Sequence, residues 1–131
     1  MNRNTNTTPA RRSRLALACA ASVIAALGVA GCGGVLAALR DDRFGLVDNW
    51  LRHVQDVCGK HRKEINALPT EADRHARLCE LNVMEQVNHV SQTTVVRDVW
   101  ARGQPLTVHG VIYGLRDGLL RDLGISVSSP D

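Results

Sequence analysis

The chain has 131 residues, 44% hydrophobic and 22% charged, which is the composition of one globular domain rather than of a disordered segment. Its net charge of +3 comes from the first 30 residues, which contain four arginines and no acid, whereas the remainder contains 12 basic and 13 acidic residues. Because the basic excess is a short N-terminal cluster, the charge pattern excludes a basic face for nucleic-acid binding on the domain. The cysteines form no CxxC pair, which favours free or metal-bound thiols in a reducing compartment; they are Cys19, Cys32, Cys58 and Cys79.

The N-terminal segment has the residue pattern of an export signal. Arg11, Arg12 and Arg14 precede an uncharged, alanine-rich stretch over residues 15–30, which at about 16 residues is short for a transmembrane helix. The Val-Ala-Gly-Cys sequence that ends at Cys32 resembles the cleavage site of a bacterial lipoprotein, with Cys32 as the acylated residue. The alternative interpretation is that residues 1–30 come from a wrong start or reading frame.

The chain after Cys32 predicts a series of helices. A short helix is expected over residues 35–40, and apolar residues spaced three and four apart over residues 45–58 predict an amphipathic one. A polar link over residues 59–68 then leads to a long helix that begins after Thr70, a typical N-cap residue. This long helix has two apolar stripes, so we expect it to be buried between neighbours or at a subunit interface.

The last third of the chain changes from helix to strand. A helix over residues 93–102 is expected to end at Gly103 as its C-cap. Residues 106–113 are rich in β-branched side chains and predict a strand, and residues 119–125 predict a returning strand after a turn at Asp117-Gly118. Two strands alone do not make a stable sheet, so the chain has the pattern of part of a larger α/β unit.

Four stretches, in this order, resemble the C-terminal half of a β-class carbonic anhydrase. They are GCGGV at residues 31–35, GLVDNWL at 45–51, CELNVMEQV at 79–87 and a hairpin segment at 109–123. The resemblance implies an α/β fold, namely a truncated β-carbonic anhydrase fold of helices followed by a C-terminal β-hairpin.

The same resemblance divides the chain into three parts. Residues 1–30 are expected to lie outside the family fold, residues 31–125 to form its C-terminal part, and residues 126–131 to form a tail.

The resemblance implies reversible hydration of carbon dioxide to bicarbonate, with zinc as the cofactor. In the family, zinc is held by the Cys and Asp of a CxDSR segment, by a His, and by a Cys three residues after that His. The metal lowers the pKa of its bound water so that hydroxide can attack carbon dioxide. Cys32 matches the last ligand, but Val29 stands at the position of the His and CxDSR occurs nowhere in the sequence. We therefore expect an impaired or inactive chain and assign no catalytic residue.

Other candidate ligands have less support. Tyr113 matches a family Tyr that helps to hold a non-catalytic bicarbonate, although the Trp and Arg that accompany it have no counterpart here. Two pairs have spacings compatible with zinc, Cys58 with His61 and His75 with Cys79. Both of these cysteines lie on predicted apolar helix faces, where cysteine commonly packs as a small hydrophobe.

Two alternatives to a carbonic anhydrase with residual function stay open. One is a non-catalytic exported lipoprotein, or interaction module, that reuses the helical half, and the other is the product of a degenerate or misread gene. The family implies a cytoplasmic location, whereas a genuine signal over residues 11–32 implies export. The expected partners are carbon dioxide and bicarbonate, a second copy of the chain or a full-length paralogue, and no nucleic acid.

Overall fold

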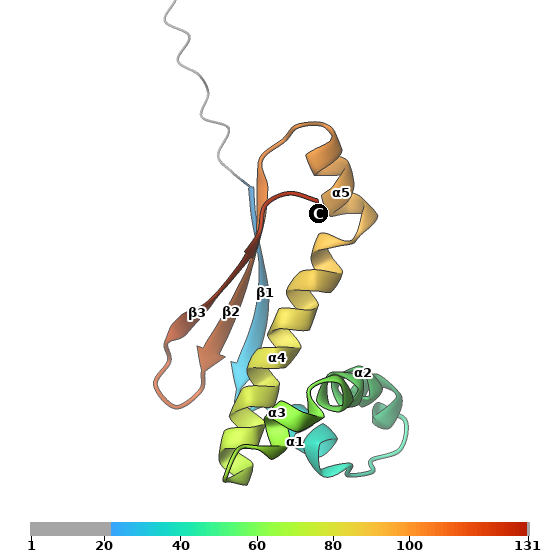
Figure 1. The fold of residues 1–131 in the computed structure, drawn as a ribbon, viewed down its shortest axis with the longest axis vertical. Coiled ribbons are helices and arrows are strands. Elements are labelled where there is room, and N and C mark those ends of the chain that lie inside the picture. The colour runs from blue at the N-terminus through green and yellow to red at the C-terminus, as the bar shows by residue number, and fades with distance from the viewer. Residues whose placement is uncertain (1–21, 131) are drawn as a thin grey trace, which may run out of the picture.

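The protein, seen in a computed structural model that describes residues 22–130, places one long helix along a small sheet (Figure 1). In chain order the elements are β1 (Ser22–Ala30), α1 (Gly33–Arg40), α2 (Val47–Lys60), α3 (Arg62–Asn66), α4 (Glu71–Ser91), α5 (Thr94–Ala101), β2 (Leu106–Gly114) and β3 (Leu120–Val127). The helices α1, α2 and α3 gather around the N-terminal half of α4, at one end of the sheet. None of the helices between residues 22 and 130 combines the length and the apolar character needed to cross a lipid bilayer.

The sheet has the strand order β1-β2-β3. β1 runs parallel to β2, from the pair Ser22 and Leu106 to the pair Ala30 and Gly114, and β2 pairs with β3 as an antiparallel hairpin. Among the described residues, the other edge of β1 has no strand partner. A parallel pair needs a long crossover connection, and here all five helices form it.

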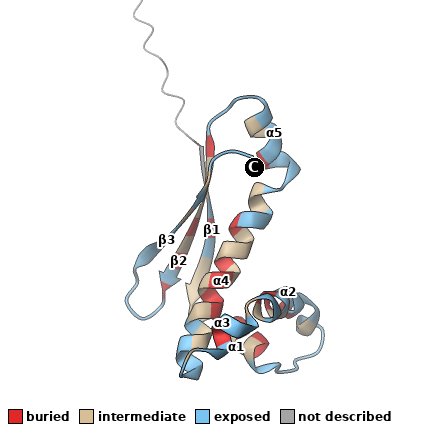
Figure 2. Ribbon diagram, in the orientation of Figure 1, coloured by how far each residue is buried: buried red, intermediate tan, exposed pale blue. Residues whose placement is uncertain are grey.

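One face of the sheet is covered by α4, which contacts all three strands. Burial alternates along β2 as a result. Leu106, Val108 and Ile112 are buried on the side of α4, whereas Tyr113, with its side chain turned to the other face, is 37% exposed. The burial colours show this difference between the covered and the open parts of the molecule (Figure 2). The part of the chain that the structure describes therefore has its core on one side of the sheet, between the strands and α4.

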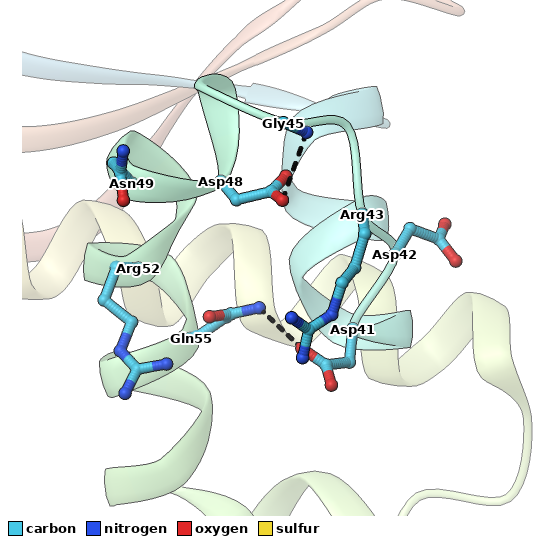
Figure 3. Close-up of a pocket in the computed structure, with 8 residues that line it drawn as sticks. All are labelled: Asp41, Asp42, Arg43, Gly45, Asp48, Asn49, Arg52 and Gln55. Atoms are coloured by element: carbon cyan, nitrogen blue, oxygen red, sulfur yellow. Dashed lines mark hydrogen bonds between the residues drawn. The ribbon is translucent and has the colours of Figure 1, made fainter.

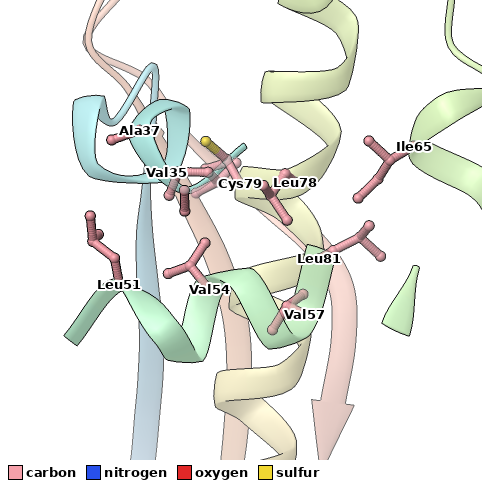
Figure 4. Packing of buried hydrophobic residues seen from close by; sticks show 11 residues of the cluster. Val35, Ala37, Leu51, Val54, Val57, Ile65, Leu78, Cys79 and Leu81 are labelled. Carbon is pink, nitrogen blue, oxygen red and sulfur yellow. The ribbon is translucent and has the colours of Figure 1, made fainter. Parts of the chain in front are cut away.

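The core consists of two apolar clusters that meet along α4. The first joins the N-terminal half of α4 to α1, α2 and α3; its buried members include Val35, Leu51, Val54, Val57, Ile65, Leu78, Cys79 and Leu81 (Figure 4). The second joins the C-terminal half of α4 to the strands and α5; its buried members are Ala26, Val83, Val87, Val96, Leu106 and Val108. The two apolar stripes predicted for the long helix thus bury it against neighbours on both sides, as expected.

The structure corrects three boundaries that the sequence analysis predicted. Residues 22–30, assigned to a segment outside the family fold, form β1 and pair with β2 along their whole length. The polar link over residues 59–68 contains the short helix α3, which forms because Ile65, 1% exposed, packs into the first cluster. The tail expected from residue 126 begins later, because β3 continues to Val127 and the hydroxyl of Ser126 bonds to Nδ1 of His109 at 2.8 Å.

The predicted helix ends agree closely with the structure. Thr70 is the N-cap of α4, and its Oγ1 accepts a hydrogen bond from the backbone N–H of Asp73 at 3.0 Å. After α5, Gly103 has a φ of 68°, the left-handed conformation that glycine adopts at low cost, and its N–H bonds to the carbonyl of Trp100.

Replacing the cap residue of α4 is expected to weaken the fold. Thr70→Ala leaves the N–H of Asp73 without its hydroxyl acceptor, which costs about 1 kcal/mol of unfolding free energy. Urea titration followed by circular dichroism measures this change. Thr94→Ala is the matched control, because Thr94 is exposed and its hydroxyl makes no hydrogen bond within residues 22–130. Equal effects of the two substitutions would show that the cap contributes nothing.

Candidate functional site

The site predicted from Cys32 lies at the turn where β1 ends and α1 begins. Gly31, with a φ of 84°, reverses the chain, and the N–H of Cys32 bonds to the carbonyl of Val29 at 3.3 Å. Cys32 is the N-cap residue of α1, and its side chain makes no capping hydrogen bond. The thiol is half-buried and is a free cysteine. The turn therefore presents an unengaged thiol at the carboxyl end of a parallel strand, a place where α/β proteins commonly bind ligands.

Two residues of α4, spaced four apart in the sequence, contact the backbone of the β1–α1 turn. His75 donates a hydrogen bond from Nε2 to the carbonyl of Cys32 at 2.9 Å. Cys79 is 2% exposed, and burial raises the pKa of its thiol. The backbone amides of Gly31 and Cys32 lie at that thiol and act in the opposite direction. The sulfur of Cys79 points toward the side of α1 in Figure 4.

A cavity of about 180 Å³ lies beside the turn. Val29 and Cys32 both line it, so the structure brings together the two positions that the resemblance pairs as His and Cys ligands. Most of the remaining lining is apolar and comes from β1, α1, α2 and α4; it includes Leu27, Val35, Trp50, Leu51, Val54 and Cys79. Asn82 and Gln86 of α4 supply its amides.

The residues at this cavity do not fit a zinc centre. Zinc in proteins is held by three or four Cys, His, Asp or Glu side chains, and a valine offers no donor atom. Within residues 22–130, no group of three or more such side chains lies close enough together to hold a metal ion. The assignment of Cys32 as a zinc ligand stays a prediction, and residues 22–130 do not supply the partners that zinc requires.

The second set of possible zinc ligands does not come together as a site. His61 lies between two carboxylates, 3.5 Å from Glu64 and 3.7 Å from Glu85, and Glu85 also pairs with Lys60. Cys58 packs against the first apolar cluster, and burial raises the pKa of its thiol. His75 and Cys79 instead hold the Cys32 turn, so the four residues serve two different parts of the structure.

Tyr113 lies next to Val29 in the register of the two strands but does not line the cavity. It is on the face of the sheet turned away from α4. Its role as a bicarbonate ligand stays a prediction.

A larger hollow, of about 400 Å³, lies at the connection between α1 and α2 (Figure 3). Its polar side chains bond to the loop itself. Asp48 accepts hydrogen bonds from the backbone N–H groups of Phe44 and Gly45 at 2.8 and 3.2 Å, and Gln55 donates to Asp41 at 2.9 Å. These bonds hold the connection at the start of α2, which is a structural role that the sequence analysis did not predict. The sequence feature that could have predicted this role is a carboxylate three residues after Gly45, at the start of a helix.

Comparison with known proteins identifies the family to which the chain is similar. A family model described as carbonic anhydrase matches residues 14–120. A carbonic anhydrase of Emericella nidulans is 41% identical over 102 residues, which are 78% of this chain and 45% of that protein. Because the match begins at residue 14, it also includes β1, in agreement with the paired sheet.

Solved structures show the same relationship. The Coccomyxa β-carbonic anhydrase in complex with acetazolamide has a TM-score of 0.76 and 32% identity, with 82% of this chain and 49% of that chain covered. A tetrameric β-carbonic anhydrase of Sordaria macrospora has a TM-score of 0.73 and 32% identity, with 82% and 54% covered. The chain spans about half the length of these relatives. In sequence and in fold, the chain belongs to the β-class carbonic anhydrase family and comprises part of its domain.

Proposed function

We propose that the reaction for which this fold evolved is the reversible hydration of carbon dioxide to bicarbonate at zinc, and that this chain alone does not catalyse it. The observation that carries the proposal is Val29, which lines the cavity beside Cys32 at the position of the family's His ligand. One thiolate does not hold zinc at a catalytic site, because such sites use three protein ligands and an open position. Membership of the family supports the class of reaction, and the valine in the lining of the cavity supports the absence of catalysis.

The purified chain is expected to show no hydration of carbon dioxide above the uncatalysed rate. A stopped-flow assay with a pH indicator measures the rate, and atomic emission measures the zinc content, which is expected to be far below stoichiometric. An active β-carbonic anhydrase under the same conditions is the positive control. Hydration that a zinc chelator abolishes would contradict the proposal, because it would require ligands that residues 22–130 do not bring together.

A second candidate function is association with another subunit. Four apolar side chains at the start of α2 and just before it are exposed, namely Phe44 at 64%, Leu46 at 90%, Val47 at 48% and Trp50 at 71%. Exposed apolar groups of this density are typical of interaction surfaces. Since the Sordaria relative is tetrameric, we propose that this segment contacts a second copy or a full-length paralogue.

The packing of β1 argues against the lipoprotein interpretation, and the cytoplasmic location rests on the family alone. Signal cleavage before Cys32 would remove β1, in which Ala26 is buried in the second cluster beside Val83. The mature chain would then expose the face of α4 that β1 covers. We therefore propose that residues 22–30 are retained in the working protein. Intact-mass measurement of the chain after expression in a bacterial host tests this, since lipidation would give a chain that begins at Cys32.

A further inference from the structure

The turn at the end of β1 brings two free thiols to one place. Cys32 and Cys79 line the same cavity, although 46 residues separate them in the sequence. His75 bonds to the carbonyl of Cys32, and the amides of Gly31 and Cys32 lie at the thiol of Cys79. Two contacts from one face of α4 thus fix the position of Cys79 relative to the backbone of Cys32.

The two thiols differ in their access to solvent. Cys32 is half-buried and its side chain is not used as a helix cap, whereas Cys79 is 2% exposed. An oxidant in solution therefore meets Cys32 first. Within residues 22–130, Cys32 belongs to no group of three or more side chains that could hold a metal ion.

We propose that Cys32 and Cys79 are a peroxide-sensitive dithiol that closes to an intramolecular disulfide. In the first step, the sulfur of Cys32 attacks an oxygen of hydrogen peroxide, the O–O bond breaks, and the leaving hydroxide takes up the proton of the Cys32 thiol, so that a sulfenic acid and water form. In the second step, the sulfur of Cys79 attacks the sulfur of Cys32, the S–O bond breaks, and a second water leaves with the proton of the Cys79 thiol. Two thiols and one peroxide thus give one disulfide and two waters.

Cys58 provides the internal comparison. It is half-buried on α2 and packs against the same apolar cluster, but it does not line the cavity. A disulfide driven only by the nearness of cysteines within the first cluster would include Cys58, whereas one set by the Cys32 turn would not.

The test is peptide mapping after oxidation of the full chain. Because trypsin leaves Cys19 and Cys32 together in residues 15–40, the experiment uses the Cys19→Ser variant. After brief treatment with hydrogen peroxide and alkylation under denaturing conditions, residues 15–40 are expected to be linked to residues 78–97. Alkylation of Cys32 and Cys79 should fall by roughly tenfold or more while that of Cys58, in residues 53–60, is unchanged. A non-reducing gel should show a monomer, since the bond is intramolecular.

Two controls keep the result decisive. The same oxidation in concentrated guanidinium chloride should abolish the preference for the 32–79 link, because the turn no longer holds the thiols together. In a Cys79→Ser variant, peroxide should leave Cys32 as a sulfenic acid that dimedone labels. Linkage of Cys32 mainly to Cys58, linkage only between chains, or over-oxidation of Cys32 while Cys79 stays alkylatable would each overturn the proposal.

Discussion

A chimera in which residues 1–30 are replaced by the N-terminal half of an active β-carbonic anhydrase, through the residue that follows its His ligand, is expected to bind about one zinc ion per chain and to hydrate carbon dioxide. The replacement supplies the CxDSR segment and puts a His three residues before Cys32. The replaced segment includes residues 22–30, which form β1 and pair with β2. The chimera therefore takes its β1 from the active enzyme. Zinc content and stopped-flow hydration are the measurements.

The matched control for the chimera is the single substitution Val29→His. It recreates two adjacent ligands at the cavity but supplies neither residue of CxDSR. We expect weak zinc binding and no catalysis, because two ligands leave half of the tetrahedral site to solvent. A chimera that folds and binds zinc but stays inactive would show that residues after Cys32 have also lost catalytic competence. Activity in Val29→His alone would contradict our assignment of the missing ligands.

Gly28→Ala is expected to destabilise the fold by about 2 kcal/mol, the largest effect we expect from adding a single methyl group. A Cβ at this position would lie 2.2 Å from Cγ2 of Val83, far inside van der Waals contact. Val83 is fully buried on α4 and is β-branched, so its side chain has few rotamers to which it can move. β1 and α4 would therefore have to move apart. Urea denaturation measures the loss.

Gly59→Ala is the control for this substitution. Gly59 lies within α2, and an added Cβ there meets no atom within 4 Å, so the change should stabilise the protein by about 0.5–1 kcal/mol through helix propensity. The double variant Gly28→Ala, Val83→Ala removes the methyl groups that clash. It should be more stable than the sum of the single effects predicts, by about 1 kcal/mol or more. Strict additivity would mean that the close approach of Gly28 and Val83 does not determine the packing distance.

The elements that sequence predicts well here are those with local signals. The long helix has a capping Thr70 and two apolar stripes, and the hairpin has Asp117-Gly118 at its turn, so both were expected nearly where they occur. β1 has no such signal. Ala, Val, Ile, Leu and Gly run through residues 23–30 without a polar residue, a pattern equally typical of a signal segment and of a buried parallel strand. Only pairing with β2, far along the chain, distinguishes the two.

The site shows the same limit. The sequence was enough to identify Val29 and Cys32 as the two ligand positions, because they lie three residues apart within one short motif. His75 and Cys79 were weighed as metal ligands from their own spacing, and their actual role depends on the packing of α4 under the Cys32 turn. The short helix α3 was missed since its five residues lie in a charged stretch and only Ile65 anchors them.

The parallel pairing of β1 with β2 has a consequence for synthesis on the ribosome. Ser22 finds its partner only when Leu106 has been made and has left the exit tunnel, so the sheet cannot form while the helices are still being translated. During that interval the apolar strand β1 is exposed on the nascent chain, and α4 has no sheet to cover. Pairings so distant in sequence are slow to form and expose chains to aggregation. The nascent polypeptide is thus expected to depend on ribosome-associated chaperones more than an all-helical protein of equal length.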